Sequence, residues 1–256
     1  MAALEDYLAR PLTPPEPAAI EAVERGPLDP RDAQSADGMD VLLDPGELPG
    51  ECGWCTLPDG CGYVAMRTPM PGVTAGMVDW WFDWHPRDPL RYRVWHPRAH
   101  HSNSIEPAAA PRAKPYWGTV HHPVEDIGTG TVHARIAFLP PAALGFSAGA
   151  LDHPAVAAIV GGLVGDDRRR MQHTKMVHVF LHADAGLVLR SRFWLGAVVR
   201  PYVPEPLAGV AARVLNRPAV RRRLVPKDVP PALARHCAEE YANLAALLPE
   251  LYGQYA

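Results

Sequence analysis

Hydrophobic and polar positions follow clear periods along the chain from Tyr63 onward. The segment YVAMRTPMPG, which starts at Tyr63, predicts a strand that leads into a turn. Residues 74–84 (TAGMVDWWFDW) are apolar and aromatic on a helical period, with Thr74 as a candidate N-cap. We therefore expect a buried helix directly after the first long strand.

The remainder of the chain predicts further strands and then helices. The strand-like segments are RYRVW, GTVHHPVEDIG, GTVHARIAFLP, KMVHVFLHAD and GLVLRSRFWLGAVV. The last two alternate on both sides of a turn at Ala185–Gly186, which predicts a hairpin. Helical patterns follow at Leu207–Leu215 and Pro231–Tyr252. Strands in succession before a long terminal helix indicate an α+β fold, with an antiparallel sheet packed by helices.

The N-terminal part of the chain has a different composition. It is rich in proline, alanine and acidic residues, and it predicts one helix at Ala18–Arg25. The segment ECGWCTLPDGC reads as two short strands around a Pro-Asp-Gly turn. We therefore divide the chain into residues 1–62, an N-terminal arm with a small helical and hairpin layer, and residues 63–256, the main domain.

Composition and charge exclude several classes of function. The 256 residues are 48% hydrophobic and 21% charged, which is typical of a globular protein. A net charge of -3 gives no general attraction to nucleic acid or to anionic membranes, so we expect neither as a partner. The sequence shows no signal peptide and no apolar run of membrane-spanning length, which predicts a cytoplasmic protein. It also lacks a P-loop.

Three of the four cysteines lie close together, at Cys52, Cys55 and Cys61. Such a cluster is compatible with a zinc knuckle or a redox pair. No fourth Cys or His follows at the spacing of a zinc ribbon, so reduced cysteines in a hairpin are the favoured interpretation. A cysteine-based zinc module that mediates interactions is kept as a third and weaker hypothesis.

The terminal helix carries the first indication of chemistry. On a helical wheel His236 and Glu240 fall within the apolar arc that Leu233, Cys237 and Leu244 define. A carboxylate within an apolar stripe is costly unless a proton, a partner or a cation compensates it. A spacing of four residues delivers an imidazole nitrogen and a carboxylate oxygen to one point, which favours a metal site over a solvent-exposed ion pair.

Two further segments place ionisable groups among apolar neighbours. Glu125 in PVEDIG lies between apolar neighbours just before a glycine turn, where a carboxylate is unexpected unless it has a function. The alternative interpretation is that it caps the strand end. On the strand from Met176, the residues Met176, His178, Phe180 and His182 share one face. This face predicts either a pocket wall able to handle protons or a solvated surface, and the periodicity does not distinguish them.

Several segments together resemble one protein family. The segments are CTLPDGCGYVA, MVDWWFDWHPRDPLRYRVWHPRAHHSN, HPVEDIG, LRSRFWLG and HCAEEYANLAALLPELY. With them the chain resembles the diacetylphloroglucinol hydrolase family, which includes phloretin hydrolase. The resemblance implies a Bet v 1-like helix-grip fold, in which a curved antiparallel sheet grips a long C-terminal helix around a deep cavity. It makes residues 63–256 the catalytic domain and gives the N-terminal extension a part in homodimer contacts.

The resemblance also implies a zinc ion (Zn²⁺) that two His and two Glu residues hold. Carried over by motif, the ligands are His100 in WHPRAHHSN, Glu125 in PVEDIG, and His236 and Glu240 in HCAEE. The neighbouring His101 is the alternative to His100. Four protein ligands exceed the three usual at catalytic zinc, and two nitrogen and two oxygen donors also suit iron or manganese.

The remaining site residues come from the same resemblance. Tyr92 in RYRVW and Asn103 in HHSN are expected to face the substrate, while His173 and His178 are candidate acid/base groups. Phe193 stands at an aromatic position that can be tyrosine in the family, so this chain offers no hydroxyl there.

The activity that the resemblance implies is hydrolysis of a carbon–carbon bond between an acyl group and a phenolic ring. A polyhydroxylated ring can accept the electrons of the broken bond by tautomerising to a diketone, which makes the reaction a retro-Claisen hydrolysis. The expected substrate is a small phenolic ketone of the phloroglucinol type or a related β-diketone. The alternative hypothesis is a protein that binds or cyclises aromatic polyketides in the same cavity without hydrolysis.

Overall fold

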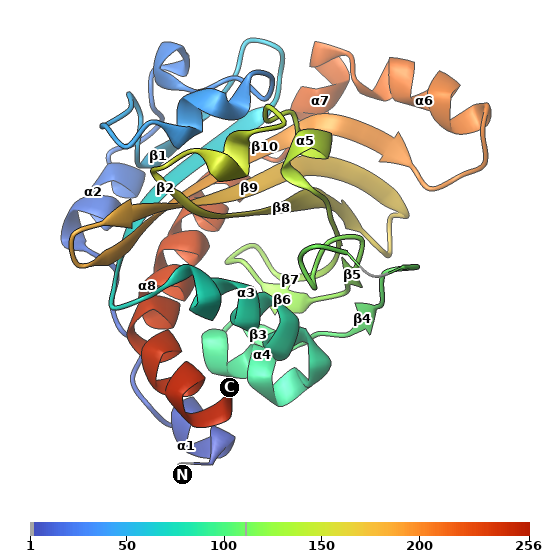
Figure 1. Cartoon of the computed structure of the whole chain (residues 1–256). Coiled ribbons are helices and arrows are strands. Elements are labelled where there is room, and N and C mark those ends of the chain that lie inside the picture. The colour runs from blue at the N-terminus through green and yellow to red at the C-terminus, as the bar shows by residue number, and fades with distance from the viewer. Residues whose placement is uncertain (1–2, 111) are drawn as a thin grey trace.

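An antiparallel sheet dominates the computed structural model, which describes residues 3–110 and 112–256 (Figure 1). The strand order is β1-β2-β10-β9-β8-β7-β5-β4, and β6 pairs with both β7 and β3. The strands are β1 Gly53–Thr56, β2 Gly62–Pro71, β3 His100–Ser102, β4 Ile105–Glu106, β5 Val120–His121, β6 Val124–Asp126, β7 Thr131–Phe138, β8 Val156–Asp166, β9 Met171–Ala183 and β10 Gly186–Pro201.

Helices cover the sheet from below in Figure 1, where α8, α3 and α4 lie under the strands. The α-helices are α1 Leu4–Leu8, α2 Pro17–Glu24, α3 Ala75–Trp84, α4 Pro89–Trp95, α5 Pro141–Leu144, α6 Leu207–Leu215, α7 Pro218–Leu224 and α8 Val229–Tyr255. Short 3₁₀ helices are η1 Pro30–Asp32, η2 Met39–Leu43, η3 His85–Arg87 and η4 Ala150–Asp152. None of the helices in the described part of the chain combines the length and the apolar character that a membrane crossing requires.

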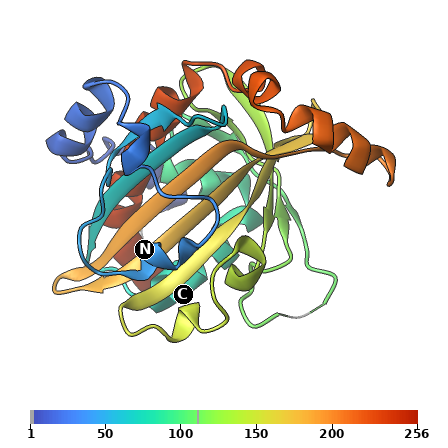
Figure 2. The ribbon, with the colours of Figure 1, turned by 90° about the horizontal axis from the view of Figure 1, so that it is seen from above.

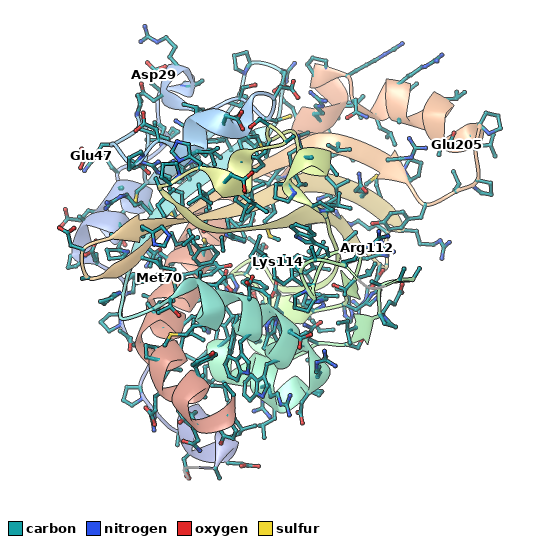
Figure 3. All side chains as sticks on the ribbon, in the orientation of Figure 1. Asp29, Glu47, Met70, Arg112, Lys114 and Glu205 are labelled. Atoms are coloured by element: carbon teal, nitrogen blue, oxygen red, sulfur yellow. The ribbon has the colours of Figure 1, made fainter. Side chains whose placement is uncertain are left out.

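The main core lies between the sheet and the helices beneath it, where side chains fill the space (Figure 3). Val64 of β2, Phe180 of β9, Trp81 of α3 and Leu244 of α8 are among its fully buried members. The sheet bends beyond β8, so that β5, β6 and β7 come down beside α3 and α4 (Figure 1). A curved sheet around a long C-terminal helix is the predicted α+β, Bet v 1-like helix-grip arrangement, and this prediction is confirmed.

A second core lies on the other face of the sheet. Leu42 and Leu43 of η2 and Phe146 pack there against Tyr63 and Trp194. Figure 2 shows the N-terminal segment, in blue, crossing this face of the strands. The sheet is therefore buried on both faces, and β1, which belongs to the predicted N-terminal unit, is its edge strand.

Several predicted elements are confirmed and one is wrong. The helix from Thr74 is α3, and the Thr74 side chain accepts a hydrogen bond from the backbone N–H of Met77. The hairpin at Ala185–Gly186 joins β9 to β10. The segment RYRVW, however, is helix and not strand, because Asp88 caps α4 by accepting from the N–H of Leu90 (2.7 Å) and Pro89 occupies the first helical position.

Two further differences concern strands. The segment GTVHHPVEDIG forms two short strands, β5 and β6, which Pro123 separates because proline offers no N–H to a ladder. Strand β8 was not predicted at all. Its sequence, VAAIVGGLVGD, lacks polar alternation because both faces of this strand are covered.

Candidate metal centre

Helix α8 carries His236 and Glu240 one turn apart on its buried face. The two residues are 6% and 8% exposed, and Nε2 of His236 lies 3.8 Å from Oε2 of Glu240. Cys237 and Leu244 are buried on the same side of the helix. The prediction that this pair faces the protein interior, and not the solvent, is confirmed.

His100 joins this pair from the first residue of β3. Its side chain is fully buried, and its Nε2 lies 3.5 Å from Oε2 of Glu240 and 3.7 Å from Oε2 of Glu125. Its Nδ1 lies 3.2 Å from the carbonyl oxygen of Tyr92. With the proton on Nδ1 for this bond, Nε2 is left as a lone-pair donor. The neighbouring His101 is exposed, so only His100 reaches the cluster.

Glu125 reaches the cluster because β6 pairs with β3 in a register that sets Glu125 opposite His100. The hydroxyl of Tyr92 donates a hydrogen bond to Oε2 of Glu125. The rings of Tyr92 and His100 stack face to face, with centroids 4.1 Å apart and planes at 1°. The predicted residues Tyr92, His100 and Glu125 therefore lie together with the pair on α8.

The residues present fit a divalent metal ion. One ligand atom from each of His100, His236 and Glu240 lies within 4.8 Å of the others, and all three residues are buried. Nε2 of His100 is buried without a hydrogen-bond partner among the described residues. A buried nitrogen without a partner, beside carboxylates, is costly unless a ligand satisfies it. Two imidazoles with two carboxylates form a donor set that suits zinc, iron or manganese.

Burial dominates the electrostatics of the cluster. It raises the pKa of Glu240 to about 8, with the charge of Glu125 adding to the effect and His236 opposing it. It lowers the pKa of His100 to about 4, and that of His236 to about 4. Without a cation, Glu240 therefore holds a proton near neutral pH while both imidazoles are uncharged, and a metal ion bound there would displace that proton.

We expect protein stripped of metal to lose stability between pH 6.5 and pH 8. The pKa of Glu240 rises from 4.5 to about 8 on folding, so its favourable contribution is complete below pH 4.5 and is lost as the pH rises through 8. The buried histidines have lowered pKa values, so their contribution rises with pH around their unfolded value of 6.5 and becomes nearly constant only above about pH 7.5. The contribution of Glu240, taken as the difference from the Glu240→Gln variant, falls by about 2 kcal/mol over this window.

Urea unfolding of chelator-treated protein at both pH values measures this loss. The stripped Glu240→Gln variant is the control, because it has no carboxyl group to titrate and should show no decline. An equal decline in the variant would assign the effect to another group.

A small inner cavity of about 80 Å³ lies beside the metal residues. Tyr92, Asn103, Glu125, His236 and Glu240 line it together with His178 of β9. Nδ1 of His178 lies 2.8 Å from Oγ of Ser191, and burial lowers the pKa of His178 to about 3. The pocket-wall interpretation of the β9 face thus holds for His178, whereas His182 on the same strand is exposed.

Other candidates lie elsewhere. His173 is half-buried on β9, where its Nδ1 lies 2.8 Å from Oγ1 of Thr174, and it does not line the cavity. Its role stays a prediction.

The cysteines are free thiols, and Cys61 donates to a carboxylate oxygen of Asp59 (3.3 Å) in the β1–β2 turn. Within the described residues, the metal-binding cluster includes none of them.

The sequence prediction missed two histidines that line the same cavity, His85 and His121. His121 is 2% exposed, because β5 turns its ring inward while its neighbour His122 faces outward. The alternation of the two adjacent side chains showed that at most one could point inward, but did not show which.

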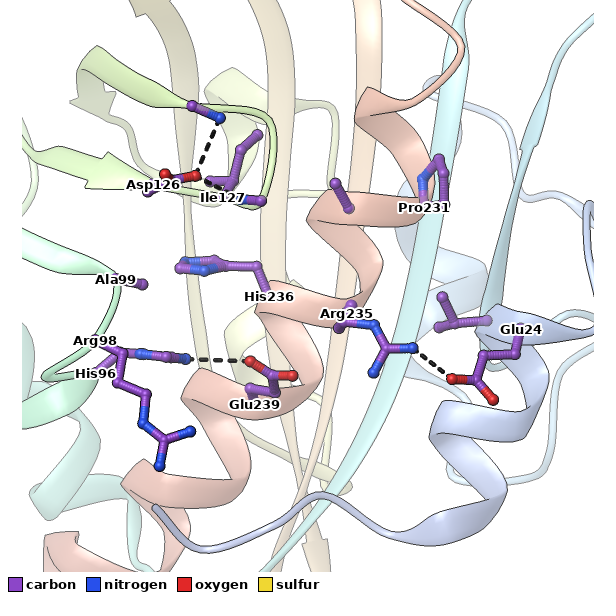
Figure 4. A pocket seen from close by; sticks show the side chains of 14 residues that line it. Glu24, His96, Arg98, Ala99, Asp126, Ile127, Pro231, Arg235, His236 and Glu239 are labelled. Carbon is purple, nitrogen blue, oxygen red and sulfur yellow. Dashed lines mark hydrogen bonds and ion pairs between the residues drawn. The ribbon is translucent and has the colours of Figure 1, made fainter. Parts of the chain in front are cut away.

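A larger outer cleft of about 630 Å³ also reaches His236. In Figure 4 the His236 ring points from α8 toward Ala99 and the loop at Asp126. On the next turn Glu239 pairs with His96 (3.4 Å), whose ring stacks on that of His236 with centroids 5.4 Å apart. His236 thus lies between the inner cavity and the outer cleft.

Two known proteins are similar in sequence to this chain over most of its length. A 2,4-diacetylphloroglucinol hydrolase from Pseudomonas sp is 29% identical over 248 residues, which cover 93% of this chain and 83% of that protein. A phloretin hydrolase from Eubacterium ramulus is 28% identical over 257 residues, which cover 97% of this chain and 88% of that protein.

Likenesses to solved structures are distant. Ara h 8.0201 has a TM-score of 0.34 and 12% identity, and the match covers 64% of this chain and 97% of that one. Norcoclaurine synthase from Thalictrum flavum has a TM-score of 0.36 and 8% identity, over 77% of this chain and 90% of that one.

The sequence model of one family, described as the DAPG hydrolase PhiG domain, matches residues 34–253. This span includes the buried cluster, the inner cavity and all of the sheet. The chain therefore belongs to the DAPG hydrolase family.

Proposed function

We propose that this protein is a zinc-dependent hydrolase that cleaves the carbon–carbon bond between an acyl group and a polyhydroxylated phenyl ring. The observation that carries the proposal is the buried cluster of His100, His236 and Glu240, with Glu125 3.7 Å from His100, beside an aromatic cavity in a chain of this family. Its relatives are named as hydrolases of 2,4-diacetylphloroglucinol and phloretin, which supports a phenolic ketone as the substrate class.

The four residues would hold the zinc ion. Bound there, it would supply Lewis acidity toward a carbonyl oxygen and lower the pKa of a bound water molecule. The protein side chains contribute orientation. Glu125 accepts from the Tyr92 hydroxyl, which fixes that phenol at the cavity wall, and the Tyr92 carbonyl fixes the tautomer of His100.

His178 is the group that we assign to proton transfer. It is uncharged, since burial lowers its pKa to about 3, and its Nδ1 is engaged with Ser191. Nε2 is therefore the nitrogen left to take a proton from the attacking water and to deliver it to the ring carbon that loses the acyl group, while the hydroxide ends in the released acid. Phe138, Phe193 and Tyr241 line the same cavity and exclude water from the ring.

Elemental analysis combined with a hydrolysis assay tests the proposal. The purified protein should contain one equivalent of zinc and should release a carboxylic acid from an acylated phloroglucinol, together with the free phenol. A metal-loaded protein that binds these ketones without releasing acid would instead be a binding protein of this fold.

The variant His178→Ala is expected to lower kcat by roughly 10²–10⁴-fold, which is the usual contribution of a positioned acid or base. Its zinc content should stay at one equivalent, because His178 does not belong to the metal cluster. His182→Ala is the matched control, as it removes an exposed histidine from the same strand. Equal rates in the two variants would remove His178 from the mechanism.

A further inference from the structure

The inner cavity holds polar groups that the metal cluster does not use. They belong to His85 of η3, His121 of β5 and Asn103 beside β3, which are 2%, 2% and 4% exposed. Nε2 of His121 and Oδ1 of Asn103 are both buried without a hydrogen-bond partner among the described residues. Buried polar groups in folded proteins are normally satisfied, so two unsatisfied groups in one cavity indicate a ligand that bonds to them.

His85 has a tautomer that its surroundings determine. Its Nδ1 lies 2.7 Å from the carbonyl oxygen of Trp81, which can only accept, so Nδ1 carries the proton and Nε2 is an acceptor. The ring stacks on Trp81, with centroids 5.0 Å apart and planes at 21°. These contacts hold the imidazole in one orientation at the cavity wall.

His121 lies next to His85, with ring centroids 5.8 Å apart. Its ring packs against Phe138, with centroids 4.5 Å apart, and no described group bonds to its Nε2. Burial lowers the pKa of His121 to about 3 and that of His85 well below its usual value, so both imidazoles are uncharged. Tyr92 connects this pair to the metal cluster, because its ring lies close to one ring of each. Its ring centroid is 6.0 Å from that of His85 and 4.1 Å from that of His100.

We propose that His85 and His121 bind a hydroxyl group of the substrate ring and so select polyhydroxylated rings. An uncharged imidazole pair and a phenolic hydroxyl match chemically, since a hydroxyl donates one hydrogen bond and accepts others. Phe193 in the same cavity has no hydroxyl and offers a ring no hydrogen bond, whereas His85 and His121 each carry a ring nitrogen that can bond to one. The inference rests on the proposed function for the identity of the ring, and it assigns specificity and not bond cleavage to the two histidines.

A site that hydrogen-bonds a substrate hydroxyl discriminates strongly against the analogue that lacks it, because the analogue leaves buried polar groups unpaired. The variant His121→Phe removes the nitrogens and keeps a flat ring beside Phe138. We expect wild-type protein to bind phloroglucinol at least 10-fold more tightly than resorcinol, which has one hydroxyl fewer. In His121→Phe this ratio should fall toward one, mainly through weaker binding of phloroglucinol.

Calorimetric titration with the two phenols measures the ratio without any hydrolysis, and kcat/KM for the matching acylated phenols provides a second readout. His122→Asn is the matched control, since the His122 side chain faces outward to Glu106 and Asp167.

Thermal unfolding gives an independent check. His121→Phe should raise the melting temperature, because it removes a buried polar atom that the ligand-free protein leaves unsatisfied.

The possible outcomes separate this inference from the proposed function. If wild-type protein hydrolyses acylated phloroglucinols and His121→Phe keeps the full preference for phloroglucinol, the assignment of His121 is overturned and the function stands. If wild-type protein hydrolyses none of them but its binding of phloroglucinol depends on His121, the function fails and the hydroxyl site stands. His85→Phe serves as the second variant, and it should reduce the same ratio.

Discussion

Replacing Glu240 by alanine is expected to remove the bound zinc and to lower the hydrolysis rate at least about 10³-fold. The carboxylate is central to the cluster, with Oε2 at 3.5 Å from Nε2 of His100 and 3.8 Å from Nε2 of His236. Without it, two uncharged imidazoles and the more distant Glu125 form a weak site. A metal ion contributes several kcal/mol of charge stabilisation to such a reaction, and each 1.36 kcal/mol is tenfold in rate.

Elemental analysis and the assay of released acid measure both effects. Glu239→Ala is the matched control, because Glu239 precedes Glu240 on α8 but turns to the outer cleft and pairs with His96. This control should keep one equivalent of zinc. A protein that retains stoichiometric zinc and full activity after substitution of both His236 and Glu240 would contradict the proposed site.

Replacing Arg190 by methionine is expected to lower the free energy of unfolding by about 3–5 kcal/mol, the usual loss when one partner of a buried ion pair is removed. Arg190 is 1% exposed on the outer face of β10. Its guanidinium donates to Glu51 (2.6 Å) and to the carbonyl groups of Leu42, Asp44 and Gly46. The variant leaves that carboxylate and those carbonyls without this donor, and it loosens the N-terminal segment from the sheet.

Thermal unfolding of the metal-loaded protein measures the loss, which corresponds to roughly 6–20 °C in melting temperature for a chain of this size. Arg200→Ala is the control. Arg200, near the end of β10, pairs at the surface with Glu205, which Figure 3 labels in the loop before α6. Exposed pairs of this kind contribute little. Equal melting temperatures in the two variants would show that the Arg190 network does not hold the N-terminal segment.

Local patterns account for the correct predictions of secondary structure, and competing local patterns account for the error. The helix from Thr74 and the β9–β10 hairpin each follow from periodicity and a cap or turn within the segment. RYRVW alternates like a strand, yet the Asp-Pro pair before it starts a helix. Five residues are too few for periodicity to decide, so the signal at the helix start outweighs the alternation.

The four candidate metal ligands also differ in how far local sequence patterns predict them. His236 and Glu240 follow from a helical wheel, because both belong to one element and the buried carboxylate requires a partner. His100 and Glu125 were assigned only through a family resemblance. They meet because β3 and β6 pair in one register, which no property of either segment alone specifies.

The sequence by itself determined the α+β class, the apolar face of the terminal helix and the pair of ionisable groups on it. The helix face and its ionisable pair depend on side-chain spacing within one element, and the fold class depends on the order of strands and helices along the chain. Both can be read directly from the sequence. Only the tertiary structure decided that His85, His121 and His178 line one cavity with the metal cluster. Those residues come from η3, β5 and β9, and the bend of the sheet and the packing of α3 and α4 under it bring them together. Such convergence depends on contacts between distant segments, which spacing along the sequence does not encode.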